Sequence, residues 1–434
     1  MNKRLLALLS LALVSGAIAA PAGSPPPSAA TLAERAEAEL RKDILPFWLK
    51  HARDPKTGKF IGSLSNDLTV AKPGPRGTIL AARILWTYSA AYRHYPEPAY
   101  LEMAKAAYAD LENNFRDPQN GGYYWMIDGD GHPVDPGKQT YAESFALYGL
   151  SEFARATGDK AALDRAIEIY RLLEQHAFDQ EHGGYVDLFT RDWKVPPPRG
   201  FFSFGGAPGP KSQNTMLHLM ESYTNLLRVW PDPDLRKALR SMVDVMLTRV
   251  LDPEGLHVRQ FFSLDWKPTS DDISFGHDIE FSWLLTETAE VLGDAELIAR
   301  TRQMAVAIAQ DILKRGIDPD GGLVYEGTRE KVTNGSKDWW PQAEAAVGFV
   351  NAYQISGDPK FLTAAQRSWA FIEQFIIDHQ NGEWFWGVNR TGTVRSSAGG
   401  KIGFWKCPYH NSRACLELMT RLRAPGRAAE VPTK

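Results

Sequence analysis

A repeated turn motif sets the strongest limit on the fold of this chain. Six segments each place an Asp three or four residues before a Gly and then continue into aromatic or β-branched residues. They are DPKTGKFIG from Asp54, DPQNGGYYW from Asp117, DQEHGGYVD from Asp179, DPEGLHVRQ from Asp252, DPDGGLVYE from Asp318 and DHQNGEWFW from Asp378. Successive motifs begin 60 to 73 residues apart, and so regular a period is typical of a repeat architecture. Each motif predicts a turn followed by a short strand.

Pairs of amphipathic helical patterns fill the intervals between the motifs. Residues 139–156 and 160–176, for example, carry apolar residues at helical spacing on either side of the break ATGDK. The chain contains about twelve such patterns, and because a helix pair cannot bury its apolar face alone, the pairs must stack on their neighbours. We expect an all-α fold, the (α/α)6 barrel, with short β-hairpins in the long loops of one rim. An open solenoid is the alternative, but unusual residues gather in the long connections, which favours a closed ring with a cleft at one rim.

The first 19 residues have the composition of an export signal. Lys3 and Arg4 precede the apolar run 5–14, which is shorter than the roughly 20 residues that span a bilayer, and the small residues 17–19 follow as a cleavage site. We expect an exported protein, periplasmic or secreted, with no stable membrane insertion after cleavage; an uncleaved anchor is the alternative. Residues 20–31 predict a Pro/Ala/Ser-rich tether, residues 32–423 a single barrel domain and residues 424–434 a C-terminal tail.

Charge and cysteine content narrow the class of partner. The formal net charge is -3 and no long block of Lys and Arg is present, so we expect no nucleic-acid partner. Two cysteines, Cys407 and Cys415, cannot form a disulfide framework, and no Cys/His spacing indicates structural zinc. Thirteen tryptophans are typical of a large core or of a cleft that binds a ring. A sugar or another small neutral molecule therefore stays open as the substrate, and the oligomeric state is not predicted.

Aligning the repeats locates a candidate site. Counting back fourteen residues from the acidic residue of each short break reaches Arg83, Phe145, His218, Glu280 and Glu344. Four of these five carry charged or imidazole groups where a packed helix would place an apolar residue, and such groups are costly to bury unless they are paired or solvated. We expect these positions to face a shared polar cavity on the axis of the ring. Buried ion pairs between the inner helices are the alternative, above all for Glu344.

Three of the ten histidines, His218, His277 and His410, are predicted near the entrance ends of three different inner helices. In HDIE, His277 and Glu280 share one helical face, so the carboxylate could orient the imidazole and raise its basicity. The same pair could also bind a metal with His218 or His410 as a further ligand, but no ligand spacing supports this, and we expect no metal.

Histidines, an arginine and tryptophans at one site suit proton transfer on a polar ring. A histidine whose pKa lies near ambient pH can take a proton next to a carbonyl, and an arginine can stabilise the enediolate oxygen. A glycoside hydrolase would instead use two carboxyl groups, and Glu280 and Glu344 could supply them. A catalytically silent sugar-binding barrel is the third possibility, although a pure binding site needs no paired proton carriers.

Five longer motifs follow one another between about residues 40 and 420. They are RGTILAARILWTYSAAYR, KSQNTMLHLMESYTNLLRVWPD, SFGHDIEFSWLL, KDWWPQAEAAVGF and FWKCPYHNSRACLEL. In these motifs the chain resembles the N-acylglucosamine 2-epimerase superfamily, and most closely the cellobiose 2-epimerases. The resemblance implies an (α/α)6 barrel, no metal or organic cofactor, and epimerisation at C2 of a reducing-end mono- or disaccharide from glucose to mannose configuration. An aldose-ketose isomerase on the same scaffold is the near alternative, since it passes through the same enediolate.

The resemblance also assigns roles to single residues. It places the acid/base pair on His277 and His410, one on each face of the opened sugar, and makes His218 and Arg83 the residues that assist ring opening and hold the C1 and C2 oxygens. The predicted substrate-binding residues are Tyr141, Asn214, Glu280, Trp340, Trp405 and, from the repeat alignment, Glu344. Between residues 191 and 210 the chain departs from the family: VPPPRGFFSFGGAPGP replaces an acidic stretch. The contacts to the reacting ring are therefore expected to be intact, and those to a second sugar are left open.

Overall fold

The computed structural model describes residues 28–70, 74–196, 209–252, 254 and 256–423. The predicted signal 1–19, most of the predicted tether, the tail 424–434 and the stretch 197–208 lie outside the described residues. The first helix begins at Ala29, with the Ser28 side chain accepting from the Thr31 amide, so helical structure starts three residues before the predicted domain boundary. Within the described ranges, each helix is too short or too polar to cross a membrane.

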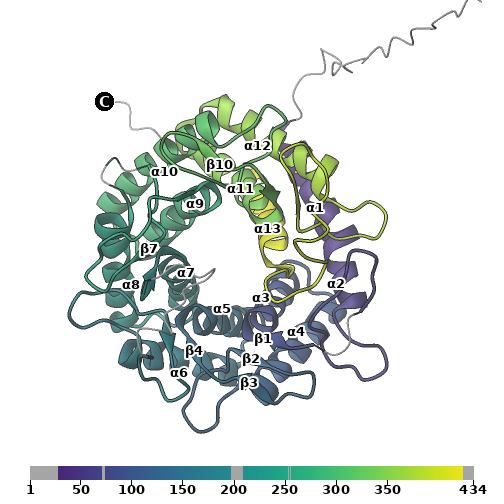
Figure 1. Ribbon diagram of the computed structural model, residues 1–434, viewed down its shortest axis with the longest axis vertical. Coiled ribbons are helices and arrows are strands. Elements are labelled where there is room, and N and C mark those ends of the chain that lie inside the picture. Colours follow the sequence, from purple (N-terminus) through teal and green to yellow (C-terminus); the bar gives the residue numbers. More distant parts are fainter. Residues whose placement is uncertain (1–27, 71–73, 197–208, 253, 255, 424–434) are drawn as a thin grey trace, which may run out of the picture.

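Twelve continuous helices form two concentric rings in the described part of the chain (Figure 1). The inner ring consists of α3 (Thr78–His94), α5 (Thr140–Thr157), α7 (Gln213–Val229), α9 (Phe275–Leu292), α11 (Trp339–Ser356) and α13 (Tyr409–Arg423). The outer ring consists of α1 (Ala29–Glu39), which continues through a π-helical turn into α2 (Leu45–His51), and of α4 (Pro98–Asp110), α6 (Lys160–His176), α8 (Pro233–Val245), α10 (Ala295–Arg315) and α12 (Pro359–Phe371). The last helix, α13, packs against α1, α3 and α11 and closes the ring. The (α/α)6 barrel is confirmed, and the open solenoid is excluded.

Burial separates the two rings. Every residue of α5 from Thr140 to Ala154 is buried, as expected for a helix surrounded by others. The outer helix α6 buries a single stripe that includes Ala162, Ala166 and Leu173, one helical turn or two apart. The apolar core therefore lies between the two rings. The faces of the inner helices that point to the axis of the barrel can then carry polar groups.

Short breaks reverse the chain from each inner helix to the next outer one. Three of these breaks use the same pair of residues, a Gly with φ of 70 to 73° that ends the inner helix and an Asp whose side chain caps the outer one. In ATGDK, for example, Gly158 has φ of 73° and Asp159 accepts from the amide of Ala162. All inner helices consequently begin at one rim and end at the other.

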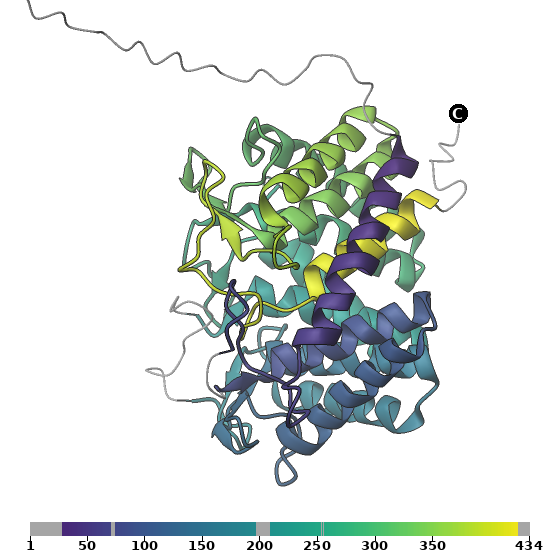
Figure 2. The ribbon, with the colours of Figure 1, turned by 90° about the vertical axis from the view of Figure 1, so that its right-hand side faces the viewer.

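The strand-bearing connections gather at the rim where the inner helices begin (Figure 2). Each strand that leads into an inner helix pairs antiparallel with a strand of the following connection. The pairs are β1 (Arg76–Gly77) with β2 (Met126–Ile127), β4 (Lys138–Gln139) with β5 (Leu188–Phe189), β6 (Lys211–Ser212) with β7 (Phe261–Phe262), β8 (Ile273–Ser274) with β9 (Glu326–Gly327), and β11 (Lys337–Asp338) with β12 (Gly387–Val388). Two hairpins are completed by β3 (Pro133–Asp135) on β2 and by β10 (Val332–Asn334) on β9. The pairing thus links neighbouring repeats as well as closing hairpins.

The six Asp-Gly motifs each form a closed turn. A bridge joins the residue before the Asp to a residue beyond the Gly in all six, as between Arg116 and Tyr123. In four motifs the Asp also binds a buried lysine that precedes the next inner helix. The ion pairs are Asp117–Lys138, Asp179–Lys211, Asp318–Lys337 and Asp378–Lys401, with N–O distances of 2.7 to 3.2 Å. The predicted turns are confirmed, and in these four the carboxylate ties the turn to the start of the next inner helix.

Candidate active site

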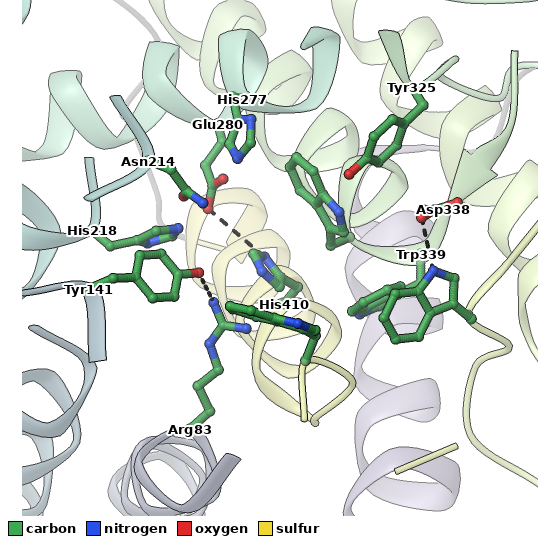
Figure 3. A pocket seen from close by; sticks show the side chains of 13 residues that line it. Arg83, Tyr141, Asn214, His218, His277, Glu280, Tyr325, Asp338, Trp339 and His410 are labelled. Carbon is green, nitrogen blue, oxygen red and sulfur yellow. Dashed lines mark hydrogen bonds and ion pairs between the residues drawn. The ribbon is translucent and has the colours of Figure 1, made fainter. Parts of the chain in front are cut away.

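A cavity of about 250 Å³ lies where the inner helices begin (Figure 3). Its walls are formed by Arg83, Tyr141, Asn214, His218, His277, Glu280, Tyr325, Asp338, Trp339, Trp340, Trp386, Trp405 and His410. Most of these residues stand in the first two turns of an inner helix. Six helix starts therefore converge on one cavity, and their partial positive ends favour negative charge there.

Nine of the ten predicted site residues line this cavity, and Glu344 does not. Its carboxylate lies behind His410 and is 1% exposed. Phe145, a second position from the repeat alignment that does not line the cavity, is also buried, and its ring centroid lies 4.0 Å from the Arg83 guanidinium carbon. The expectation that both positions face the cavity needs correction: the alternative of a buried ion pair describes Glu344, because Arg413 binds it.

Four further wall residues were not identified from the sequence: Tyr325, Asp338, Trp339 and Trp386. Tyr325 and Trp386 lie at the ends of the motifs that start at Asp318 and Asp378. In these two motifs the chain turns back over the rim, and one aromatic residue after the Gly reaches the cavity. That position in the repeat was the available signal.

Two of the three site histidines are held by carboxylates. Nδ1 of His218 lies 2.9 Å from Glu221 Oε2, and Nδ1 of His410 lies 2.7 Å from Glu344 Oε1. Burial lowers the pKa of His218 to about 4, despite the opposing effect of Glu221, and lowers the pKa of His410 well below its ordinary value. Both imidazoles are therefore neutral near pH 7. Glu221 is ionised, because its pKa is held at about 2, and an ionised carboxylate only accepts hydrogen bonds; Nδ1 of His218 therefore carries the proton and Nε2 keeps its lone pair for a substrate. Burial raises the pKa of Glu344, but its Oε1 also accepts from Nη2 of Arg413, so Nδ1 of His410 donates to an oxygen that already acts as an acceptor.

His277 is held differently. Its Nδ1 is buried and makes no hydrogen bond within the described chain, and its ring packs 4.7 Å from that of Trp340. Removal from water lowers the pKa of His277 to about 3. The expectation that Glu280 orients His277 within HDIE is wrong, because the Glu280 carboxylate binds Arg413 instead. The carboxylate three residues along the helix that does orient a histidine is Glu221 in MLHLMES, which the sequence also displayed.

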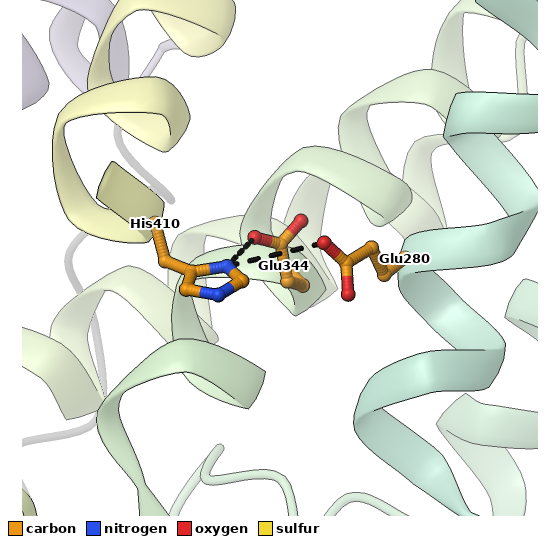
Figure 4. Close-up of side chains that lie close together, drawn as sticks. All are labelled: Glu280, Glu344 and His410. Carbon is orange, nitrogen blue, oxygen red and sulfur yellow. Dashed lines mark hydrogen bonds and ion pairs between the residues drawn. The ribbon is translucent and has the colours of Figure 1, made fainter. Parts of the chain in front are cut away.

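Glu280, Glu344 and His410 come close enough to suggest a metal site, since one ligand atom of each lies within 4.8 Å of the others (Figure 4). However, Nη2 of Arg413 donates to Glu280 Oε1 at 2.5 Å and to Glu344 Oε1 at 2.7 Å. A guanidinium thus supplies the positive charge between these carboxylates. The cluster of Glu280, Glu344 and His410 therefore does not fit a divalent cation.

The same contacts bear on the hydrolase alternative. A glycosidase places its two carboxyl groups on either side of the scissile bond. Here Glu280 and Glu344 share one nitrogen of Arg413, and only Glu280 reaches the cavity wall. Burial and the neighbouring charge of Glu344 raise the pKa of Glu280 well above its ordinary value. The pair does not flank a substrate.

Arg83 places a fixed positive charge in the cavity wall. It is 2% exposed, and its Nη2 donates to Tyr141 Oη at 2.7 Å. Its guanidinium lies beside the ring of Tyr409, 4.9 Å away, and forms no ion pair with any carboxylate of the described residues. A buried cation without a counter-ion favours a substrate that becomes negatively charged.

Two half-buried tryptophans complete the wall. Trp340 lies between the catalytic candidates, with its ring 4.7 Å from His277 and 5.7 Å from His410. Trp405 stands above Tyr141, with ring centroids 6.1 Å apart. Aromatic faces of this kind bind the apolar face of a sugar ring.

Comparisons with known proteins agree with this geometry. Residues 58–412 match the family described as N-acylglucosamine 2-epimerase (GlcNAc 2-epimerase). A cellobiose 2-epimerase from Bacteroides fragilis is 41% identical over 393 residues, which cover 89% of this chain and 98% of that protein. The solved structure of cellobiose 2-epimerase from Bacillus thermoamylovorans B4167 has a TM-score of 0.85 at 38% identity, covering 90% of this chain and 100% of that one. A D-mannose isomerase from Marinomonas mediterranea is 24% identical over 405 residues, 89% of this chain and 96% of that protein.

Proposed function

Because the chain belongs to the N-acylglucosamine 2-epimerase family, we propose that it inverts the configuration at C2 of a reducing-end sugar. The substrate class is a cellobiose-like disaccharide, and the reaction interconverts the glucose and mannose configurations. One observation carries the proposal: the imidazoles of His277 and His410 face one cavity that also holds the Arg83 guanidinium, which forms no ion pair with the described residues. The identity of 41% to a cellobiose 2-epimerase over most of both chains supports the substrate class.

The reaction follows from the chemistry of an opened sugar. Once the ring opens, the C1 aldehyde makes the proton on C2 acidic, and one histidine removes it through Nε2. The electron pair moves onto the C1 oxygen, giving an enediolate whose charge Arg83 stabilises. The second histidine enters this step as an imidazolium that has taken a proton from solvent; it delivers that proton from Nε2 to the opposite face of C2, and the ring closes with inverted configuration. Each turnover leaves the two histidines with exchanged protonation states, so the reverse reaction uses the same groups.

The isomerase alternative differs only in the last step, since a proton returned to C1 gives a ketose. The cellobiose 2-epimerase is 41% identical to this chain and the D-mannose isomerase 24%, which favours the epimerase. Both alignments cover nearly the whole length of the relative, so the difference in identity does not come from a partial alignment.

An NMR experiment tests the proposal. Purified protein is incubated in deuterated water with cellobiose, mannobiose, glucose and mannose separately. We expect deuterium at C2 and both C2 epimers from a disaccharide, because the proton carried by each histidine exchanges with solvent. A ketose product would favour the isomerase, and monosaccharides released from a disaccharide without deuterium at C2 would contradict both.

We further propose that the protein is exported. The charged start Lys3-Arg4, the apolar run 5–14 and the small residues 17–19 support this. Expressed in a Gram-negative host, the wild-type chain should be found in the periplasm with a mass that lacks residues 1–19. Leu8→Arg, which interrupts the apolar run, should keep the full-length chain in the cytoplasm. Full-length wild-type protein in the cytoplasm would contradict the proposal.

A further inference from the structure

We propose that Arg413 is a positioning residue that holds His218 and His410 in their reactive orientation through two carboxylates. The inference rests on the proposed epimerase function for its kinetic test. The observation behind it is a buried network in which one guanidinium binds three carboxylates, and two of those carboxylates bind site histidines.

The network begins on the last helix. Arg413 follows His410 by three residues on α13, is 2% exposed and reaches three other inner helices. Its Nη1 binds Glu221 of α7, and its Nη2 binds Glu280 of α9 at 2.5 Å and Glu344 of α11 at 2.7 Å. The guanidinium meets these carboxylates with two nitrogens in one rigid plane, whereas a lysine has a single nitrogen that cannot occupy both positions.

Two of these carboxylates in turn orient the imidazoles of His218 and His410. Glu221 accepts from Nδ1 of His218 and Glu344 from Nδ1 of His410, so each imidazole turns Nε2 toward the cavity. The Tyr409 hydroxyl donates to Glu221 at 2.6 Å and fixes that carboxylate further. His277 is not part of this network, since its Nδ1 finds no acceptor among the described residues.

The guanidinium also keeps the Glu221 carboxylate ionised, whereas burial still raises the pKa of Glu280 and of Glu344. Burial alone would raise the pKa of Glu221, but the charge of Arg413 and the hydrogen bond from His218 outweigh it and hold that pKa at about 2. Three carboxylates buried together without the cation would bind protons. A protonated carboxyl group is a weaker acceptor and can donate to Nδ1 instead, which would turn the reactive lone pair away from the sugar.

Arg413 can be reached from the end of the barrel opposite the active site. A second cavity of about 480 Å³ lies there, and Arg413 forms part of its wall together with Arg228, Trp283 and Glu417. A free guanidinium ion can therefore enter this second cavity and reach the position of the Arg413 side chain without competing with the sugar in the active site. This makes chemical rescue of an Arg413→Ala variant possible.

The kinetic test compares Arg413→Ala and Arg413→Lys with Arg228→Ala, which removes an arginine of the same cavity that binds Glu287. We expect kcat on cellobiose to fall about 100-fold in both Arg413 variants while KM changes less than about threefold, because binding groups stay in place. Guanidinium chloride at tens of millimolar, well below unfolding concentrations, should raise kcat of Arg413→Ala about tenfold, and should not activate His410→Ala. Arg228→Ala should keep wild-type kcat. Thermal unfolding and circular dichroism establish that each variant is folded.

A second measurement is independent of activity. Nitrogen-15 NMR of the imidazoles should place the proton of His218 and His410 on Nδ1 in the wild-type protein and on a mixture of both nitrogens in Arg413→Lys, with His277 unchanged. If Arg413→Ala does not fold, Glu344→Gln and its control Glu417→Gln replace it. Wild-type kcat in folded Arg413→Lys, or unchanged tautomers there, would overturn the inference. A wild-type protein with these tautomers but no C2 exchange would refute only the epimerase function.

Discussion

His277→Ala and His410→Ala will each abolish interconversion of the C2 epimers, with kcat at least about 1,000-fold below the wild-type value. Inversion requires proton removal on one face and delivery on the other, so the loss of either imidazole stops the cycle. The rate of epimer formation from cellobiose, measured by NMR or by chromatography, gives the result. His257→Ala is not a suitable control, because His257 is buried against Asp278; the exposed His132 serves instead.

The two variants should nevertheless differ in C2 exchange. Each retains one base, which can still remove the C2 proton of the epimer that it faces and return deuterium to the same face. We therefore expect each variant to exchange C2 of one epimer without inversion, and the two variants to act on opposite epimers. Retention of most epimerase activity by either variant would refute the two-base assignment. Exchange of the same epimer by both variants would show that the two histidines act on the same face of C2, and would also refute the assignment.

Arg83→Lys should lower kcat about 100-fold to 1,000-fold, a loss typical of removing one donor that stabilises a developing oxyanion. Lysine keeps the charge but cannot hold both Tyr141 and a substrate oxygen in the geometry of the guanidinium fork. KM should change much less, because the enediolate charge develops only after binding. Steady-state kinetics on cellobiose measure both quantities.

Arg93→Lys is the matched control for this variant. Arg93 stands on the same helix, α3, but pairs with Glu152 at the opposite end of the barrel. We expect its kcat to match the wild-type value. An Arg83→Lys variant that loses only substrate affinity would assign Arg83 to binding and leave the enediolate to other groups.

The fold was predictable because its signal repeats. Six turn motifs and the short breaks, three of them with Gly-Asp, indicate where the helix pairs begin and end, and the structure confirms the barrel and the strand-bearing connections at one rim. The same regularity located the site, since equivalent positions in equivalent helices must reach the same depth of the ring. That is how Arg83, His218 and Glu280 were placed on one cavity without knowledge of their contacts.

The pairing of side chains was not predictable in the same way. Spacing within one helix suggested that Glu280 orients His277, but the nearest cation, Arg413, comes from another helix and binds that carboxylate. Which of several nearby partners a buried group binds depends on how the helices pack against each other, and one repeat does not encode that. The prediction that Glu344 faces the cavity was wrong for the same reason. The repeat gave its position along the inner helix correctly, but its side chain points to Arg413 and not to the cavity.

Closure of the ring by its last helix has a consequence for synthesis of the protein. His410 and Arg413 stand on α13, the final described element, while Arg83 stands on α3, the first inner helix. During translation, Arg83 is therefore synthesised long before His410 and Arg413, which complete the site. The site is complete only when α13 packs against α1, α3 and α11, so translation products that lack α13 are expected to be inactive toward sugar.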